Sequence, residues 1–413
     1  MVAQISVPVD EDAVRDIVET CLANETALEI MGAGTRRLLG RPVAAEQILT
    51  IRALSGITLY EPAELVLQAH AGTLLSHVRA ALEEHNQQLA FEPPDWGPLL
   101  GGPADAATIG GVMAGNLAGP RRFRAGAARD HLLGARFVSG RAEVIKTGGR
   151  VVKNVTGYDL CKLLTGSYGT LGVLTEVTLK VLPAPDKTRT VLVFGLDAQT
   201  AQTAMASALN SPHDISGAAY LPEAIAGRSG VGYVADAGKS ATAFRLEGPE
   251  PSVLARCAAV RALLAGQGIA EELHYHNSLR FWDEVGNVAP FADGTDAPVW
   301  RVSLPPAEMA RVMAAIGARG LSENFADWGG GLIWIRVGDD TEDAPENACA
   351  AVIRGAIAAC GGHATLIRAP AAIRSRVPVF QPAPPGLSAL SARVKHGFDP
   401  HHILNRGRMV EGA

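Results

Sequence analysis

Short apolar runs and glycine-rich turns alternate along the N-terminal part of the chain. Apolar residues recur at helical spacing behind Asp10, whose side chain suits an N-cap, so a helix is predicted there. Apolar runs at 27–31 and 65–67 predict short strands, and the alternating run at 173–181 predicts a longer, buried strand. Thr73 precedes a second amphipathic pattern and is the expected cap of that helix. Helices and strands are therefore mixed in this part of the chain.

Two proline-rich breaks divide the rest of the chain. Pro183 and Pro185 interrupt the strand pattern, and a second break covers 378–385. Between the breaks, strands are predicted at 190–194 and 333–336. The helices predicted between them cover residues 200–209, 251–265, 306–318 and 344–359, and one more lies in the tail. Mixed strands and helices of this kind predict an α+β domain.

Composition limits the class of protein. The chain has 413 residues, 47% hydrophobic and 19% charged, which predicts two or three folded domains with a large core. A net charge of −5 and a pI near 6.1 argue against a nucleic-acid partner, because such a partner requires a basic face. The five cysteines form no C-x-x-C pair, so neither an iron–sulfur cluster nor a cysteine zinc site is predicted. Reduced thiols in a cytoplasmic protein are expected.

The sequence predicts neither a membrane span nor a signal peptide. No apolar run approaches the roughly 18 to 20 residues that a spanning helix requires. The N-terminus carries Asp10, Glu11 and Asp12 where a signal peptide has a basic region and an apolar core. Any attachment to the inner membrane is therefore expected through partner proteins.

Glycine is concentrated between Lys153 and Glu176. This stretch contains four glycines: Gly157, Gly166, Gly169 and Gly172. Because glycine has no Cβ, such density indicates a backbone that lies close to another group. Since the loop leads into a strand that is predicted to be buried, the interpretation is a ligand with polar groups.

Three glycine loops in the first half are suited to phosphate binding. They lie at 32–36, 108–111 and 169–172, and each can direct successive backbone N–H groups into a concavity. The first loop does not have the Rossmann spacing, because Arg37 stands where the third glycine belongs, and no Walker A motif is present. One such loop has little specificity, but three together suit a long phosphate-bearing cofactor.

Six motifs place the chain next to a known family. They are FEPPD (91–95), ATIGGVMAGNLAGPRR (107–122), RDHLLG (129–134), VVKNVTGYDLCKLL (151–164), GSYGTLGVLTEVTLKVLPAP (166–185) and FDPHHILNRGR (398–408). With these motifs the chain resembles the PCMH-type FAD-binding domain of the vanillyl-alcohol oxidase and D-lactate dehydrogenase superfamily. Within it, the chain resembles the FAD-binding subunits of bacterial three-subunit glycolate oxidases.

The resemblance implies a two-lobed fold. Residues 1–186 would form the FAD-binding domain from two α/β subdomains, and 187–377 a central α+β cap. The segment 378–413 would return to the flavin domain.

The resemblance also implies which residues hold the cofactor. Gly32, Ala33, Gly34, Thr35 and Arg36 would lie at the FAD pyrophosphate, with Thr108, Ile109, Gly110 and Gly111 opposite them. Gly169, Thr170, Gly172 and Val173 would follow the cofactor with their main chain. The remaining expected contacts are Pro94, Asn116, Asn154, Gly157, Tyr158 and Asn405. Some relatives attach the flavin through a histidine in the first loop; Ala33 and Thr35 stand there in this chain, so noncovalent FAD is expected.

The chain lacks the HxGDGNxH metal segment of the catalytic 2-hydroxyacid dehydrogenases in this superfamily. His274, His276 and His363 have no evident carboxylate partner, so no metal site is predicted and no catalytic residue is assigned. The resemblance then implies an FAD-binding subunit of a complex that oxidises glycolate to glyoxylate. A sister flavin subunit would act on the small 2-hydroxy acid, and an iron–sulfur subunit would take the electrons.

Other functions stay open at this point. The chain is alternatively a self-sufficient FAD-linked dehydrogenase or oxidase of another 2-hydroxy acid or alcohol. A non-catalytic scaffold subunit is an alternative of another class. A nicotinamide Rossmann enzyme is disfavoured by the missing third glycine.

Overall fold

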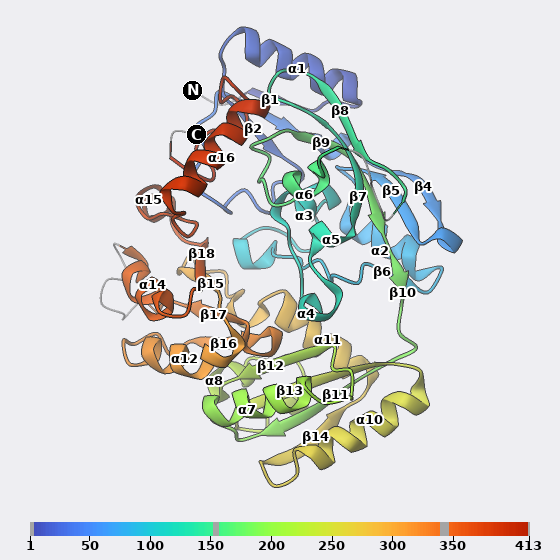
Figure 1. Cartoon of the computed structure of the whole chain (residues 1–413), viewed down its shortest axis with the longest axis vertical. Helices are drawn as coiled ribbons and strands as arrows, with labels where there is room; N and C mark the ends of the chain where they lie inside the picture. The colour runs from blue at the N-terminus through green and yellow to red at the C-terminus, as the bar shows by residue number, and fades with distance from the viewer. Residues whose placement is uncertain (1–3, 152–156, 339–346, 412–413) are drawn as a thin grey trace. The chain divides into compact units, whose positions relative to one another are not determined.

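The computed structural model describes residues 4–151, 157–338 and 347–411. Its contacts divide the chain into two compact units (Figure 1). Unit 1 comprises Met1–Ala118, Gly126–Ala184 and Pro378–Ala413, and unit 2 comprises Gly119–Ala125 and Pro185–Val377.

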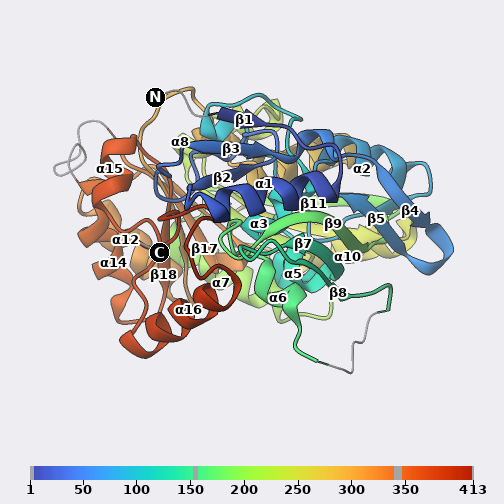
Figure 2. The same ribbon diagram turned by 90° about the horizontal axis from the view of Figure 1, so that it is seen from above.

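Unit 1 begins with a small parallel sheet in the order β1 (Gln4–Ser6), β3 (Gln47–Thr50), β2 (Leu28–Met31), visible in Figure 2. The preceding helix, α1 (Glu11–Ala23), starts as predicted, because the Asp10 carboxylate accepts a hydrogen bond from the N–H of Ala13 at 2.8 Å. The C-terminal segment returns to this sheet: Leu28 donates to Ile403, and Asn405 donates to Leu28, through their main chains.

The second sheet of unit 1 is antiparallel and has five strands. Its order is β4 (Ile57–Glu61), β5 (Val66–His70), β9 (Val173–Lys180), β7 (Leu132–Val138), β8 (Val144–Gly148). The central β9 is almost entirely buried, which explains its apolar sequence. The other elements of unit 1 are α2 (Leu75–Glu83), β6 (Gln87–Gln88), α3 (Ile109–Gly115), α5 (Ala128–His131), α6 (Leu160–Leu164), β10 (Leu182–Pro183), α16 (Pro385–Phe398), and the 3₁₀ turns η1 (Ile51–Ala53), η2 (Pro62–Glu64) and η3 (Pro98–Leu100).

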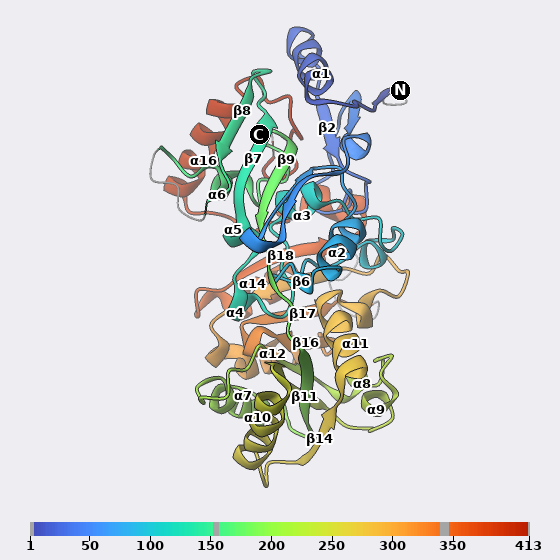
Figure 3. The same ribbon diagram turned by 90° about the vertical axis from the view of Figure 1, so that its right-hand side faces the viewer.

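Unit 2 is built on one eight-stranded antiparallel sheet. Its order is β14 (Ile269–Leu273), β11 (Lys187–Phe194), β13 (Ala241–Gly248), β12 (Gly217–Leu221), β16 (Asn324–Asp327), β17 (Leu332–Arg336), β15 (Val299–Ser303), β18 (His363–Arg368). Four helices cover one face of the sheet, and α11 (Tyr275–Gly286) packs on the other face against β11 (Figure 3). The four are α7 (Ala198–Leu209), α10 (Glu250–Leu263), α12 (Met309–Gly317) and α14 (Ala350–Ala358). Shorter elements are α4 (Arg122–Ala125), α8 (Glu223–Ala226), α9 (Gly232–Ala235), α15 (Ala371–Arg376), η4 (Ala289–Phe291), η5 (Pro306–Glu308) and η6 (Trp328–Gly330).

The structure confirms the α+β class but corrects some local predictions. Thr73 does not cap α2: that helix begins after Leu74, and the Thr73 hydroxyl instead donates to the carbonyl of His70 at 2.7 Å. The single helix predicted at 306–318 is divided into η5 and α12. The helix predicted at 344–359 begins at Ala350 in α14, and residues 344–346 lie outside the described part of the chain.

No helix among the described residues is long and apolar enough to cross a membrane.

Candidate cofactor-binding site

A cleft in unit 1 gathers the three glycine loops and the C-terminal segment. It holds about 820 Å³ of space that atoms do not occupy, open solvent at its mouth included. The lining residues are Ile30, Met31, Gly32, Ala33, Gly34, Thr35, Arg36, Arg37, Leu39, Ile51, Thr108, Gly110, Gly111, Ala114, Gly115, Ser167, Tyr168, Gly169, Gly172, Leu174, Asn405 and Arg408. Eleven of the predicted cofactor contacts are among them: Gly32, Ala33, Gly34, Thr35, Arg36, Thr108, Gly110, Gly111, Gly169, Gly172 and Asn405.

The loops meet through contacts that a Cβ atom would block. A Cβ on Gly32 would lie 2.2 Å from the hydroxyl oxygen of Thr108, which joins the first loop to the second. A Cβ on Gly169 would lie 2.7 Å from Nδ2 of Asn405, which joins the third loop to the tail. Both distances are far below van der Waals contact, so only glycine permits this arrangement.

These contacts correct the interpretation of the glycine-rich stretch. A Cβ on Gly172 would lie 2.5 Å from Cδ2 of Phe137, and Gly169 adopts a positive φ of +72° against Asn405. The backbone therefore does lie close to another group, but at these two positions that group is protein. Gly169 and Gly172 both line the cleft, and their close packing also brings its walls together.

Asn405 links two walls of the cleft. Its Oδ1 accepts a hydrogen bond from the N–H of Ile30 at 2.9 Å, and its Nδ2 donates to the carbonyl of Tyr168 at 2.7 Å. The residue adopts a positive φ of +44°, a conformation that asparagine tolerates better than most residues. One side chain thus holds the end of β2 beside the loop that precedes β9.

The first loop presents donors that the protein does not use. The main-chain N–H groups of Ala33, Gly34 and Thr35 have no hydrogen-bond acceptor among the described residues. The loop is held from behind instead, because the hydroxyl of Thr50 donates to the carbonyl of Gly32 at 2.7 Å. Unpaired N–H groups that face a cleft suit the oxygens of a phosphate.

Arg36 brings a positive charge into the same cleft. Its Nη2 donates to the carbonyl of Pro94 at 3.2 Å, while its buried Nε has no partner among the described residues. Burial lowers the pKa of Arg36 to about 10, and only the charge of Asp95 opposes this shift. A half-buried cation whose buried Nε has no partner among the described residues is costly unless an anion joins it.

Arg408 is a second arginine on the cleft, and the sequence analysis did not identify it. Its Nη2 donates to Glu29 at 2.9 Å and its Nη1 to the carbonyl of Leu39 at 3.0 Å. Glu29 also accepts a hydrogen bond from Arg37 at 2.7 Å. Burial lowers the pKa of Arg408, and its buried Nε has no partner among the described residues. The arginine therefore fixes the first loop to the tail and keeps one donor free.

A buried ion pair supports the tail behind the cleft. Lys395 Nζ contacts the Asp399 carboxylate and donates to the carbonyls of Thr170 and Leu404 at 2.8 and 3.0 Å. Asp399 in turn accepts hydrogen bonds from the main-chain N–H groups of Ile403 and Leu404. With its hydrogen bonds satisfied in this way, the pair positions the loop around Thr170.

Other predicted contacts lie behind the cleft wall. Ile109 and Val173 are fully buried in the core, and the hydroxyl of Thr170 donates to the carbonyl of Ser167 at 2.7 Å. Pro94 contributes its carbonyl to Arg36. The hydroxyl of Thr170 and the carbonyl of Pro94 are therefore already hydrogen-bonded within the protein.

The predicted contacts nearest the glycine-rich turn do not line the cleft. The Oδ1 atom of Asn116 accepts a hydrogen bond from the N–H of Arg129 at 3.1 Å. Gly157 is exposed, and the side chain of Tyr158 is 91% exposed. Asn154 lies outside the described residues.

Two of the histidines of unit 2 belong to one helix: His274 is the N-cap of α11, and His276 lies within that helix. Burial lowers the pKa of His363, and the nearby charges of Arg301 and Arg122 lower it further.

Comparison with known proteins agrees with this architecture. A family model described as an FAD binding domain matches residues 2–148. The glycolate oxidase subunit GlcE of Escherichia coli (strain K12) is 35% identical over 397 residues, 96% of each chain. The glycolate oxidase subunit GlcD of Bacillus subtilis (strain 168) is 29% identical over 188 residues, 45% of this chain and 38% of that protein. Among solved structures, 4-ethylphenol oxidase from Gulosibacter chungangensis has a TM-score of 0.73 at 15% identity, covering 98% of this chain and 88% of that chain.

The fold and the cleft define an FAD-linked oxidoreductase with the PCMH-type fold of the vanillyl-alcohol oxidase and D-lactate dehydrogenase superfamily. Within that class, the chain belongs to the family of the glycolate oxidase subunit GlcE. The family predicted from the six motifs is therefore confirmed.

Proposed function

We propose that the cleft of unit 1 binds FAD noncovalently and that the chain serves as the FAD-binding subunit of a glycolate-oxidising complex. The observation that carries this proposal is the convergence of three glycine loops on half-buried Arg36 and buried Arg408, each with a buried Nε that has no partner among the described residues. A dinucleotide with a diphosphate suits this donor set, because it supplies the missing negative charge and several acceptor oxygens.

Some residues of the cleft would contact the cofactor, and others hold the walls of the cleft in place. The N–H groups of Ala33, Gly34 and Thr35 and the guanidinium of Arg36 would bind the diphosphate. Asn405 and Arg408 hold the surrounding walls in place, as their hydrogen bonds to β2 and the first loop indicate. FAD, when bound, supplies the redox chemistry of the complex.

A noncovalent site agrees with the composition of the cleft. No histidine or cysteine is among its lining residues in the described part of the chain. The five cysteines are free, and those of unit 1, Cys21 and Cys161, are buried. Free thiols also favour a cytoplasmic location, with any contact to the inner membrane made through partners.

The partner subunits are proposed on the family relationship. A sister flavin subunit would carry out the chemistry on glycolate, and an iron–sulfur subunit would receive the electrons. The relative from Bacillus subtilis, itself a glycolate oxidase subunit by name, supports a sister flavin subunit, because it is 29% identical to this chain over 188 residues.

The flavin proposal is tested with the purified chain. Reconstitution with FAD is expected to give visible flavin bands, and acid precipitation is expected to release all of the flavin into the supernatant. Flavin retained in the washed pellet would show a covalent bond. A chain that shows no flavin bands after reconstitution would instead be the scaffold.

The assembly proposal requires the other subunits. Glycolate-dependent dye reduction is expected only when the chain is co-expressed with the sister flavin and iron–sulfur subunits. Turnover of glycolate by this chain alone would contradict the division of labour and would favour a self-sufficient dehydrogenase.

A further inference from the structure

The C-terminal helix α16 leaves its apolar residues uncovered. Of its 14 residues only Lys395 is buried, whereas Leu387 and Leu390 are 54% and 47% exposed. A helix of this length is marginal in water, and most helices in proteins depend on a buried apolar face. The two leucines are therefore placed for contact with something outside the chain.

The helix is held only near its C-terminal end. Lys395 binds Asp399 and the carbonyl of Thr170, and the carbonyl of Phe398 accepts a hydrogen bond from Gly140 at 2.9 Å. The ring of Phe398 lies 6.1 Å from that of Phe137. Its N-terminal two turns, which carry both leucines, have only exposed residues.

Neighbouring elements extend this surface. Figures 2 and 3 show α16, α6 and β8 on the same side of unit 1. The turn between β7 and β8 joins them to α16, because Arg141 donates to the carbonyl of Gly397 at 3.0 Å. Leu163 of α6 and Val144 of β8 are 37% and 38% exposed, and β8 is an edge strand that pairs only with β7. We call the exposed residues of α16, β8 and α6 the α16 face.

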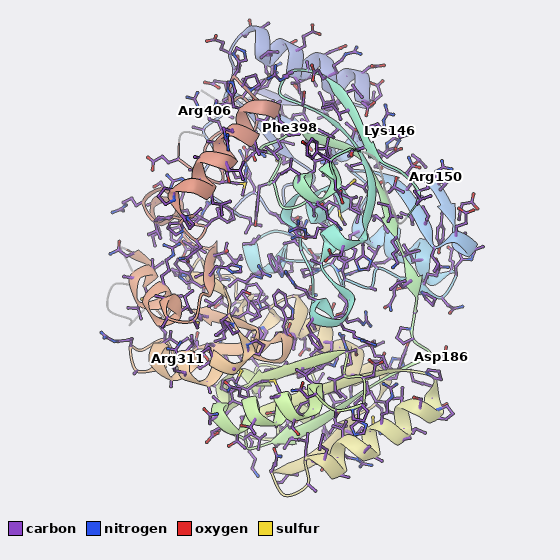
Figure 4. The ribbon with its side chains drawn as sticks, in the orientation of Figure 1. Lys146, Arg150, Asp186, Arg311, Phe398 and Arg406 are labelled. Atoms are coloured by element: carbon purple, nitrogen blue, oxygen red, sulfur yellow. The ribbon has the colours of Figure 1, made fainter. Side chains whose placement is uncertain are left out.

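Positively charged side chains without a partner among the described residues lie on these elements or follow them closely in sequence. Lys146, Arg150, Arg393 and Arg406 have no ion-pair or hydrogen-bond partner among the described residues, and Figure 4 labels three of them, Lys146, Arg150 and Arg406. Lys146 belongs to β8 and Arg393 to α16.

Acidic groups nearby do not balance these charges. Asp130 and Asp159 accept hydrogen bonds from the main chain at the starts of α5 and α6, and Asp130 also pairs with Lys162. Glu143 is the exposed acid on the β7–β8 turn. The α16 face thus carries exposed apolar side chains as well as basic side chains, although the whole chain has a net charge of −5.

We propose that the α16 face docks onto an acidic, apolar surface of a partner subunit of the oxidase. The inference rests on the proposed complex and specifies where this chain enters it. Charge complementarity selects an acidic partner. A lipid surface is less suited, because the exposed side of α16 carries no aromatic residue and has small Ser388, Ala389 and Ser391, which favour close packing against protein.

The main test replaces the two leucines together. L387D/L390D is expected to bind the co-expressed sister flavin and iron–sulfur subunits about tenfold more weakly or worse, since charged side chains would enter an apolar contact. FAD binding and the thermal midpoint of the isolated chain are expected to stay unchanged, because both side chains are exposed. The matched control is L254D/L263D on α10 of unit 2, whose leucines are 43% and 40% exposed and outside the face.

Two further measurements test the inference even if the L387D/L390D variant does not fold. A photo-crosslinker attached at Ser391→Cys is expected to label a partner subunit in the wild-type background. The double reversal K146E/R393E is expected to weaken assembly and to reduce its dependence on salt concentration.

Each alternative partner of the α16 face predicts a different experimental result. If the wild-type chain assembles with its partners and L387D/L390D assembles equally well, the assignment of the face is wrong while the proposed complex stands. If the wild-type chain does not assemble at all, the proposed complex and this inference both fail. Leucine-dependent binding to phosphatidylglycerol vesicles with assembly retained would identify a membrane surface, and leucine-dependent self-association would identify a second copy.

Discussion

Arginines of the two units differ in how fully the chain satisfies their donors. In unit 2, Arg121 donates to the Glu247 carboxylate at 2.8 Å, and Arg245 lies 3.7 Å from it. The two arginines hold the pKa of Glu247 near 2, although burial alone would raise it. In unit 1, Arg36 and Arg408 each keep a buried Nε without a partner among the described residues.

The difference separates stability from binding. A buried cation that meets a carboxylate of low exposure within the chain contributes to one fixed structure, as Arg121 and Arg245 do with Glu247. Arg36 has no carboxylate partner among the described residues, so an anionic ligand would complete its contacts, whereas Arg408 already pairs with Glu29 and keeps only its Nε unused. The comparison predicts that substitutions around Glu247 lower the free energy of unfolding of unit 2, whereas substitutions of the cleft arginines weaken cofactor binding.

The largest effect is expected at Glu247. Glu247→Ala leaves Arg121 and Arg245 buried without their carboxylate, so unit 2 should lose about 3 to 5 kcal/mol in the free energy of unfolding. Denaturant titration followed by tryptophan fluorescence measures the loss. Glu308→Ala removes an exposed ion pair with Arg311 and should cost less than about 1 kcal/mol. Equal losses in the two variants would refute the comparison.

Acid should weaken the same cluster. Because the folded pKa of Glu247 lies near 2, below its ordinary value of 4.5, its contribution is complete above pH 4.5. As the pH falls from 4.5 toward 2, the carboxylate is expected to lose stabilisation on the order of 3 kcal/mol. Unfolding curves of the wild type and Glu247→Gln at several pH values isolate this contribution, which the variant should lack.

Arg36→Gln is expected to affect binding rather than folding. Losing a charge-assisted contact to the diphosphate should weaken FAD binding about 10- to 100-fold. Riboflavin, which has no phosphate, should bind equally well to the wild type and the variant. Flavin fluorescence titration measures both affinities, and Arg36→Lys should recover part of the loss. A parallel loss of riboflavin affinity would mean that Arg36 only shapes the cleft.

Asn405→Ala removes the link between β2 and the loop before β9. Loss of its hydrogen bonds to Ile30 and Tyr168 should cost about 1 to 3 kcal/mol in unit 1, because two main-chain groups lose their partner. FAD should dissociate faster from the variant in stopped-flow measurements. Unit 2 serves as the internal control, since its unfolding transition should not shift.

Tyr158→Ala should have the smallest effect. Its side chain is 91% exposed and does not line the cleft, so FAD affinity is expected to change by less than about twofold. A tenfold loss of FAD affinity would return Tyr158 to the cofactor site that the family resemblance implied.

Sequence reasoning identified the parts of the cleft with a local signature. Glycine loops and a capping aspartate act over a few residues, so their patterns are visible in the chain. The Glu29–Arg408 contact joins residues 379 positions apart, and no spacing reveals it. The Lys395–Asp399 pair has helical spacing, yet its burial depends on the loop at Thr170. The role of Gly172 was also hidden, because its neighbour Phe137 comes from another strand.

The hydrogen bonds of Ile403 and Asn405 to Leu28 have a consequence for biosynthesis. The first glycine loop leaves the ribosome early. The C-terminal segment that completes the cleft is synthesised only after all of Pro185–Val377. At roughly 5 to 20 residues per second, that delay is on the order of ten to forty seconds. During this time the edge strand β2 of the small parallel sheet has not yet formed its hydrogen bonds with the C-terminal segment. Stable cofactor loading is thereby restricted to chains whose translation has passed through the whole intervening unit.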